Sequence, residues 1–387
     1  MANRPESMES STPLRVAMVP DYRSTNPYQG LIAAQLETLG VRIAFVQRTR
    51  RHVFPLRAAA RELDIDILHL HWITPFLRGS NVAAYVAYSA RLLADIAFVR
   101  ATGVCVVWTI HNKVSHETRY PALEMWVRRG IARIVDAMIV HSAEIRREIA
   151  ADFRKPLDAF DIVPHASFGN LYGEPADKRE AREALALPAN GKVFLNFGIM
   201  RPYKGLERLL ETWSSSGLST AGHTLLLAGE FNDEAYRDVI LRAAKSLGGV
   251  RIDDGRVPDD RVRFYFGASD AVVLPFQRIL TSSSLHLAIT FEKPVVAPRI
   301  ASVVETLGQA DHFLYDPEDS EALGAAMRRC AGADLEAERS EIRNSRAALM
   351  DWHEVAQATL AVYQHARQRR GSGRRKSRTA GAGIVDR

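Results

Sequence analysis

The sequence has only two cysteines, Cys105 and Cys330, among its 387 residues. Two cysteines are too few for a disulfide framework or for a metal site built on cysteine. No apolar run is expected to cross a bilayer, because charged side chains interrupt the longest candidate, residues 82–108. The polar N-terminus lacks an apolar signal core, so residues 1–13 are predicted to be a disordered leader on a cytoplasmic protein.

Net charge is almost absent outside the C-terminus, although the isoelectric point is 9.4. Residues 367–387 hold eight of the 51 basic residues and one of the 45 acidic ones, which leaves 43 and 44 elsewhere. A near-neutral body argues against a nucleic-acid-binding fold, and a basic tail indicates a local electrostatic contact.

Short apolar runs alternate with amphipathic helical stretches, which is typical of a parallel α/β sheet. In the first half, strands are predicted at 14–20, 41–47, 66–72, 104–111, 137–142 and 161–166. After a polar linker the cycle restarts, with strands at 192–200, 223–230, 249–254, 271–276, 294–298 and 312–316. The clearest helices in the first half are predicted at 28–39, 81–101, 120–133 and 143–151.

This pattern predicts two Rossmann-like, doubly wound domains facing a cleft, at residues 14–172 and 173–350. A helix at 351–366 and a disordered basic tail at 367–387 are predicted to follow. Such sheets bind ligands at the carboxyl ends of their strands. The segment after the first strand has only Gly30, so it lacks the G-x-G-x-x-G fingerprint of a NAD or FAD enzyme.

The stretch "VFLNFGIMRPYKGLERLL", residues 193–210, places two cations in a tight turn between a strand and a helix. Free backbone N–H groups at the helix start would attract anions, and Arg201 and Lys204 add two charges suited to a diphosphate. The alternative is that both cations form surface salt bridges with Glu207 and Glu211.

The same stretch resembles the F-G-x-x-x-x-x-K-G segment of group 1 glycosyltransferases, which have the GT-B fold and use nucleotide sugars. "HTLLLAGE", "VPDDRVRFYFGASDAVVLPF" and "EKPVVAPRIASVVETLG" are similar to further segments of that family, and "DIDILHLHW", "VVWTIHN" and "IVPHASFGNLY" resemble its first half more loosely. The resemblance covers roughly residues 14–365. It implies a hexosyltransferase with no cofactor and no metal ion, because no Asp-x-Asp stands where the metal would bind.

Carried over by position, the resemblance implies a donor site made of Gly198, Arg201, Lys204, Gly229, Thr281, Ser282, Ser283, Ser284 and Glu305. For the serine-rich turn the alternative is a simple helix cap, and for Glu305 a surface acid. His111 matches a family histidine near the donor sugar, and a catalytic base is expected among His71, His111 and Glu117. His69, Trp72 and His116 are predicted on the acceptor side. For His69, His71 and His111 the alternative is a structural histidine whose hydrogen bonds are made within the protein.

The sequence departs from the family where many retaining members carry two glutamates, because those positions hold Ile279 and Leu287. A similar serine-rich turn occurs in exopolysaccharide transferases that use GDP-mannose, which favours this donor and a glycan or lipid-linked saccharide acceptor. A retaining transferase that uses a UDP-sugar and a non-catalytic nucleotide-sugar or glycan-binding relative are the alternatives.

The flexible basic stretch at 367–378 predicts peripheral binding to the anionic inner face of the cytoplasmic membrane. Aromatic and aliphatic side chains of residues 72–93 are expected to contribute to that contact. The alternative is that residues 81–101 form an ordinary sheet-covering helix and that the tail is solvated.

Overall fold

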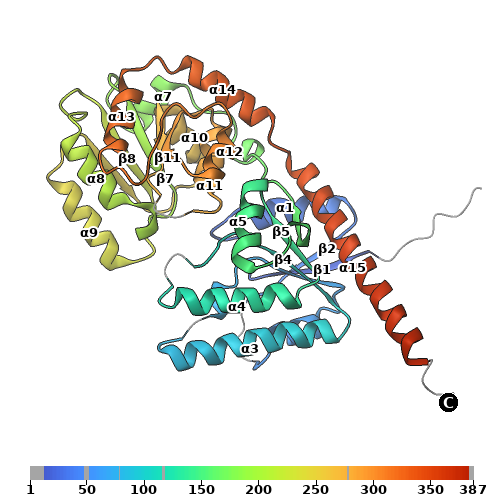
Figure 1. The fold of residues 1–387 in the computed structure, drawn as a ribbon. Coiled ribbons are helices and arrows are strands. Elements are labelled where there is room, and N and C mark those ends of the chain that lie inside the picture. The colour runs from blue at the N-terminus through green and yellow to red at the C-terminus, as the bar shows by residue number, and fades with distance from the viewer. Residues whose placement is uncertain (1–12, 48–51, 78, 116–117, 277–278, 383–387) are drawn as a thin grey trace, which may run out of the picture. The chain divides into compact units, whose positions relative to one another are not determined.

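The computed structural model describes residues 13–47, 52–77, 79–115, 118–276 and 279–382, and it divides into two compact units (Figure 1). The first unit comprises Met1–Val140, Arg146–Val163 and Trp352–Arg387. The second comprises His141–Ile145 and Pro164–Asp351. The C-terminal helix is therefore part of the first unit, and residues 164–172 belong to the second unit rather than to the first.

The first unit is built on a six-stranded parallel sheet in the order β2-β1-β3-β4-β5-β6. Its strands are β1 (Arg15–Val19), β2 (Arg42–Phe45), β3 (Ile67–Leu70), β4 (Cys105–Thr109), β5 (Ala137–Val140) and β6 (Phe160–Ile162). The central strands are apolar and buried throughout because helices cover both faces. The strand order reverses between β1 and β3, so the carboxyl end of β3 is a natural ligand site.

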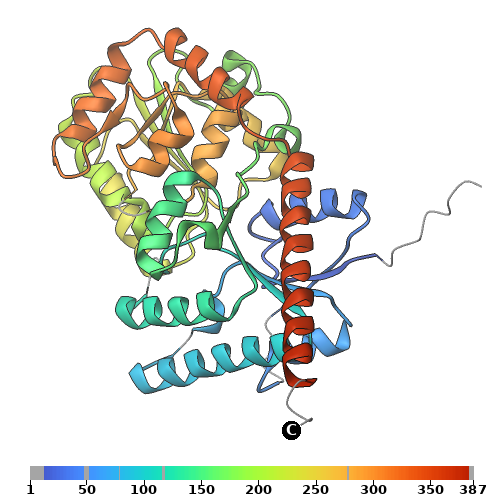
Figure 2. The same ribbon diagram turned by 45° about the vertical axis from the view of Figure 1, so that its right-hand side comes forward.

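The four helices predicted in the first half of the sequence follow their predicted bounds closely. The helices of this unit are α1 (Tyr28–Thr38), α2 (Pro55–Glu62), α3 (Val82–Ala101), α4 (Pro121–Ile134), α5 (Ala143–Phe153) and α15 (Trp352–Ala382), with short 3-10 turns η1 (Thr74–Phe76) and η2 (Leu157–Ala159). Helix α15 packs against α1, β4 and β5, while α3 packs between α2 and α4 (Figure 2). Asp95 on α3 accepts hydrogen bonds from the N–H groups of Leu56 and Arg57, which caps α2.

Helix α3 is long and apolar enough to cross a membrane by length and composition, with a mean hydropathy of 1.5. The prediction that no such run exists is therefore wrong. A third of its apolar window is buried, and the buried face packs on α2, α4 and β4, so α3 also has the contacts of a sheet-covering helix.

The second unit contains another six-stranded parallel sheet, in the order β12-β11-β10-β7-β8-β9. Its strands are β7 (Val193–Phe197), β8 (Thr224–Gly229), β9 (Val250–Asp254), β10 (Ala271–Val273), β11 (Val295–Pro298) and β12 (Leu314–Tyr315). The order reverses between β7 and β10, which is the Rossmann arrangement. Each of the strands predicted from the sequence is thus present in the two sheets.

Helices on both faces of this sheet complete the core. They are α6 (Gly169–Tyr172), α7 (Lys178–Ala184), α8 (Leu206–Ser215), α9 (Glu234–Lys245), α10 (Asp259–Ala268), α11 (Ser283–Thr290), α12 (Ala301–Leu307), α13 (Ala322–Gly332) and α14 (Glu336–Ala347), with the 3-10 turn η3 (Pro202–Lys204). Trp213 of α8, Ile240 of α9 and Met327 of α13 pack with Phe194 in one buried cluster. Phe266 of α10 contacts Phe197 and stacks on Phe291.

The last helix is longer than the sequence predicts, because α15 continues through Ala382 instead of ending at 366. Residues 367–382 are therefore helical, although a disordered tail was expected from residue 367. Three arginines on this helix have acidic partners in the first unit: Arg367 with Asp66, Arg369 with Asp161 and Arg370 with Asp136. The predicted leader, apart from Pro13, and residues 383–387 lie outside the described part of the chain.

Candidate active site

Lys204 lies at the point in the second sheet where the strand order reverses. It ends η3, directly before α8, and its side chain turns back beneath β7 so that the residue is only 6% exposed. The ammonium Nζ donates to the carbonyl of Phe197 at 3.3 Å and to Ser284 Oγ at 3.5 Å. The hydroxyl of Ser284 donates to the same carbonyl at 3.0 Å. We call Gly198, Lys204 and Ser284 the Lys204 cradle.

Two glycines, Gly198 in the Lys204 cradle and Gly229 beside it, occupy positions that favour glycine. Gly198 has φ +99°, and a Cβ there would lie 3.3 Å from the ammonium of Lys204. Gly229, at the end of β8, has φ +147°, and its Cβ would lie 2.3 Å from the carbonyl oxygen of Gly198. Gly229 therefore excludes a side chain for steric and conformational reasons, whereas at Gly198 the positive φ is the main restriction. The prediction that these glycines belong to one site is consistent with their adjacency.

Burial, and next to it the nearby charge of Arg201, lowers the pKa of Lys204 to about 7. A buried ammonium without a carboxylate is costly, because desolvation is not compensated by an opposite charge. Among the described residues, neither Arg201 nor Lys204 forms an ion pair with Glu207 or Glu211, so the salt-bridge alternative is wrong. An anionic ligand would supply the missing partner.

The serine-rich turn forms the N-terminus of α11. Ser282 is the N-cap residue and accepts a hydrogen bond from Leu285 N at 3.1 Å, so the helix-cap alternative is correct for this residue. Ser284 belongs to the Lys204 cradle, and Ser283 is partly exposed. Thr281 precedes the cap, and its buried Oγ1 has no hydrogen-bond partner among the described residues.

Glu305 lies on α12 and is exposed, which agrees with the surface-acid alternative as far as burial is concerned. Its carboxylate has a specific contact, however, because it accepts hydrogen bonds from the N–H groups of Ala143 at 2.9 Å and Glu144 at 3.0 Å. In this structure Glu305 therefore caps the start of α5. A nucleotide hydroxyl would compete with these two donors.

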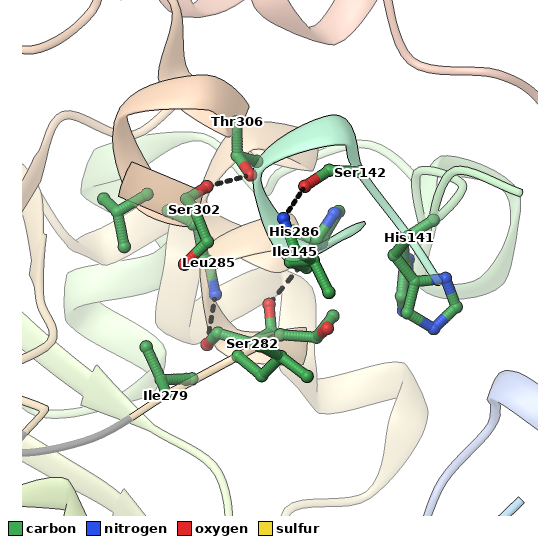
Figure 3. A pocket seen from close by; sticks show the side chains of 13 residues that line it. His141, Ser142, Ile145, Ile279, Ser282, Leu285, His286, Ser302 and Thr306 are labelled. Carbon is green, nitrogen blue, oxygen red and sulfur yellow. Dashed lines mark hydrogen bonds between the residues drawn. The ribbon is translucent and has the colours of Figure 1, made fainter. Parts of the chain in front are cut away.

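A small cavity of about 30 Å³ adjoins the serine-rich turn before α11, and three histidines line it (Figure 3). His141 follows β5, His165 follows β6, and His286 lies on α11. The rings of His165 and His286 stack with their centroids 4.1 Å apart. His286 and His141 were not predicted as site residues, because neither belongs to a motif with a recognisable spacing. Ile279 also lines this cavity.

His69 is not on the acceptor side, contrary to the prediction. The residue is fully buried in β3, with Nδ1 2.7 Å from the hydroxyl of Tyr363 on α15 and Nε2 2.7 Å from Thr109 Oγ1 on β4. Burial lowers the pKa of His69 to about 3, so the ring is neutral. Both ring nitrogens are used within the fold, and His69 therefore joins strand β3 to α15.

His71 and His111 come together at the carboxyl ends of β3 and β4. The Nδ1 of His71 lies 3.1 Å from the Nε2 of His111, so one proton is held between the two rings. Trp72 stacks on His111 at a centroid distance of 4.3 Å and an angle of 15°. Tyr28 meets both histidines edge-on. The structure thus assembles three predicted residues into one cluster, whereas His116 and Glu117 lie outside the described residues.

A buried ion pair that was not predicted from the sequence fixes the loop that follows His111. Glu124 and Arg128 lie one turn apart on α4, with Arg128 Nη2 2.7 Å from Glu124 Oε1. The same carboxylate oxygen accepts hydrogen bonds from the N–H and hydroxyl of Ser115, and Arg128 donates to the carbonyl of Asn112. The i, i+4 spacing of a Glu and an Arg was a detectable signal. These contacts hold residues 112–115 in place beside His111.

Within the described ranges, no group of three His, Cys, Asp or Glu side chains is arranged to hold a metal ion. At the Lys204 cradle, an anion could bind to the charges of Arg201 and Lys204 and to the backbone N–H groups in the first turn of α11. The arrangement is therefore suited to bind phosphate groups at the second sheet.

Comparison with known proteins finds glycosyltransferases. Residues 191–332, which contain the Lys204 cradle, match the family described as glycosyl transferases group 1. The chain is 26% identical over 265 residues to a GDP-mannose:glycolipid 4-beta-D-mannosyltransferase from Xanthomonas campestris pv. campestris, which covers 68% of this chain and 70% of that one. Residues 191–332 therefore form a domain of the group 1 glycosyltransferase type.

Solved structures support the same fold. Sucrose-phosphate synthase from Thermosynechococcus elongatus superimposes with a TM-score of 0.70 at 17% identity, over 91% of this chain and 98% of that one. Anabaena HepE in complex with UDP and glucose gives a TM-score of 0.66 at 15% identity, over 91% and 99%. The two parallel-sheet units have the GT-B fold, as the sequence predicts.

Proposed function

We propose that this glycosyltransferase transfers a hexose, with mannose from GDP-mannose favoured, to a glycan or lipid-linked saccharide in exopolysaccharide or glycolipid synthesis. The observation that carries the proposal is the buried ammonium of Lys204, which has no carboxylate partner within the described ranges and lies where the strand order of the second sheet reverses. A nucleotide diphosphate sugar would supply the anionic partner that this ammonium lacks.

In this proposal the protein replaces a divalent cation in stabilising the leaving group. As the bond between the hexose and the diphosphate breaks, negative charge grows on the terminal phosphate. Lys204, held by Phe197 and Ser284, would stabilise that charge together with Arg201 and the N–H groups at the start of α11. Glycosyl transfer would then proceed without a metal ion or another cofactor.

The acceptor hydroxyl must lose a proton during transfer. The hydrogen-bonded pair of His71 and His111 can accept one, because neutral imidazole has a lone pair and its conjugate acid is stabilised by a neighbouring ring nitrogen. Trp72 stacks on His111 and would offer an apolar surface to a sugar ring. Glu117 remains a candidate base on the basis of the sequence.

The choice of donor rests on the mannosyltransferase relative, whose name specifies GDP-mannose and a glycolipid. UDP-glucose is the second donor to test, because HepE was solved with UDP and glucose. We also propose that the enzyme works at the inner face of the cytoplasmic membrane, where a lipid-linked acceptor would lie. Supporting features are the exposed Val82 and Val86 on α3, Trp126 on α4 and the basic end of the chain.

A donor panel tests the reaction. Purified enzyme is incubated with GDP-mannose, UDP-glucose or UDP-glucuronate and a membrane lipid extract, and transfer is followed with radiolabelled sugar. We expect transfer from GDP-mannose that persists in EDTA. Activity that disappears in EDTA and returns with Mg²⁺ or Mn²⁺ would contradict the metal-free mechanism. Transfer from UDP-glucose alone would show that the donor is UDP-glucose and not GDP-mannose.

A further inference from the structure

Two side chains that line the cavity beside the α11 turn have a polar atom that is available to a ligand (Figure 3). The first is Thr281 Oγ1, which is buried and makes no hydrogen bond with the described residues. The second is Nε2 of His286, a residue that is only 6% exposed. The Nδ1 of His286 uses its proton to donate to the carbonyl of Ser282 at 2.9 Å, and no described residue bonds its Nε2.

The tautomer of His286 follows from this contact. A carbonyl only accepts hydrogen bonds, so Nδ1 must carry the proton. Burial lowers the pKa of His286 to about 4, which keeps the ring neutral at pH 7 and leaves a lone pair on Nε2. Stacking on His165 fixes the orientation of the ring. His286 therefore presents a fixed, uncharged hydrogen-bond acceptor, which is complementary to a hydroxyl group.

The size of the cavity limits what can enter it. A volume of about 30 Å³ holds roughly one or two water molecules, so it admits a hydroxyl or a hydroxymethyl group but not a sugar ring. Its other polar lining comes from Ser302 and Thr306 on α12 and from His141, Ser142 and His165. The hydroxyl of Thr306 is bonded to the carbonyl of Ser302, Ser142 Oγ accepts from Ile145 N, and His165 Nδ1 lies 2.7 Å from the carbonyl of Ala166. Thr281 and His286 are thus the two groups best placed to recognise an incoming hydroxyl.

The position of the cavity links it to the donor. Thr281 and Ser282 line the cavity, and Ser284, two residues further on, is in the Lys204 cradle. A diphosphate held by Lys204 would bring its attached hexose to this turn. Resting on the proposed function, we infer that His286 and Thr281 bind one hydroxyl of the donor hexose and so determine which sugar is accepted.

This arrangement explains how the protein manages without a carboxylate at Ile279. Ile279 also lines the cavity, so its wall is apolar at that point. The neutral acceptor of His286 and the hydroxyl of Thr281 would take over hydrogen bonding to the sugar. Because neither group is charged, each contact is worth less than one to a carboxylate, and recognition depends on the position of the hydroxyl.

Binding measurements test the inference independently of transfer. Calorimetric affinities for GDP-mannose and GDP are compared in the wild-type protein and in His286→Phe, which keeps an aromatic ring against His165 but removes the acceptor. We expect affinity for GDP-mannose to fall about three- to tenfold while affinity for GDP stays within twofold. Thr281→Val, which preserves volume, should show the same selectivity. His223→Phe, which removes an imidazole distant from the turn, should change neither affinity.

A series of deoxy-mannose derivatives of GDP-mannose identifies the hydroxyl. One derivative should bind the wild-type protein more weakly than GDP-mannose does, but should bind His286→Phe as tightly as GDP-mannose does. The reason is that the deoxy change and the substitution remove the same contact. The inference is overturned if both variants bind GDP-mannose like wild type, since the cavity then holds only water. It is equally overturned if affinity for GDP falls in parallel, which would assign the contact to the ribose.

The outcomes separate this inference from the proposed function. Wild-type protein that binds GDP-mannose no more tightly than GDP, and UDP-glucose no more tightly than UDP, overturns the hydroxyl contact. Sugar-dependent binding with the expected variant effects, but without transfer to any acceptor, supports the contact and overturns only the proposed reaction. Thermal melting of each variant shows whether a loss of affinity reflects unfolding.

Discussion

Lys204 illustrates how a binding residue can weaken the protein that carries it. Burial of its ammonium costs free energy in the donor-free state, and this cost disappears when the charge is removed. Lys204→Met should therefore raise the stability of the free protein at pH 7, on the order of a few kcal/mol. The same variant should bind GDP-mannose at least tenfold more weakly, because a charge-assisted hydrogen bond to phosphate is lost.

Thermal melting and calorimetry on the same preparation measure both effects. Arg201→Ala should also weaken donor binding tenfold or more, but without the gain in stability, because Arg201 is only partly buried. Unchanged donor affinity in both variants would disprove the diphosphate site.

The pKa of Lys204 also predicts how donor binding depends on pH. In the free protein this pKa is about 7, and a bound diphosphate would raise it, so binding above pH 7 requires uptake of a proton. Affinity for GDP-mannose, whose phosphates do not titrate in this range, should be constant below about pH 6.5. It should then fall by up to tenfold per pH unit between pH 7.5 and 9.

Calorimetric titrations at half-unit steps of pH provide the measurement, and Lys204→Arg is the matched control. Arginine keeps its charge throughout this range, so the variant should show a much flatter profile. Equal slopes in wild type and Lys204→Arg would show that another group controls binding.

At the scale of elements, the cradle depends on the close approach of the turns after β7 and β8. Gly229→Ala would place a Cβ 2.3 Å from the carbonyl oxygen of Gly198, so one of the turns must move. Gly255 is a suitable control because it has a similar φ of +137° but nothing within 4 Å of its Cβ position. Gly255→Ala should therefore lose only the conformational advantage of glycine, roughly 1–3 kcal/mol.

We expect Gly229→Ala to melt at a lower temperature than Gly255→Ala and to lose donor affinity at least tenfold. Melting curves and calorimetry with GDP-mannose compare the two directly. If the alanine variants behave alike, the turns are free to separate and the cradle is less rigid than the contact implies.

The strand pattern was readable from the sequence because most strands are short apolar runs between helices. The glycines and cations after β7 were also detectable, since the turn brings together residues that are close in sequence. His286 and Thr281 could not be assigned a cavity, because its walls come from α11, α12 and the segments after β5 and β6. His69 was misplaced for a related reason, as its partner Tyr363 lies 294 residues further along the chain.

For the whole molecule, the basic end of the chain has two separable parts. Arg367, Arg369 and Arg370 have acidic partners in the first unit, whereas five further basic residues follow Gly371. Ending the chain after Gly371 would remove those five charges and retain the ion pairs. We expect the full-length protein to sediment with anionic vesicles and to be released by high salt, and the shortened protein to lose most of this binding.

A second variant tests the contribution of α3. Val86→Asp should weaken vesicle binding, while Val239→Asp on α9 should not, although the two valines are 45% and 43% exposed. If the shortened protein and Val86→Asp both bind vesicles like the full-length protein, the membrane proposal is wrong and a water-soluble acceptor becomes the better hypothesis.

The return of α15 to the first unit has a consequence for biosynthesis. The second unit is almost continuous, from Pro164 to Asp351, so a nascent chain can complete it while the ribosome is still adding the C-terminus. The first unit, although synthesised first, lacks the helix that packs on β4 and β5 and the Tyr363 hydroxyl that bonds His69 until residues 352–363 have been translated. Premature termination between Asp351 and Tyr363 would therefore leave the earliest-made unit unfinished while the later one is complete.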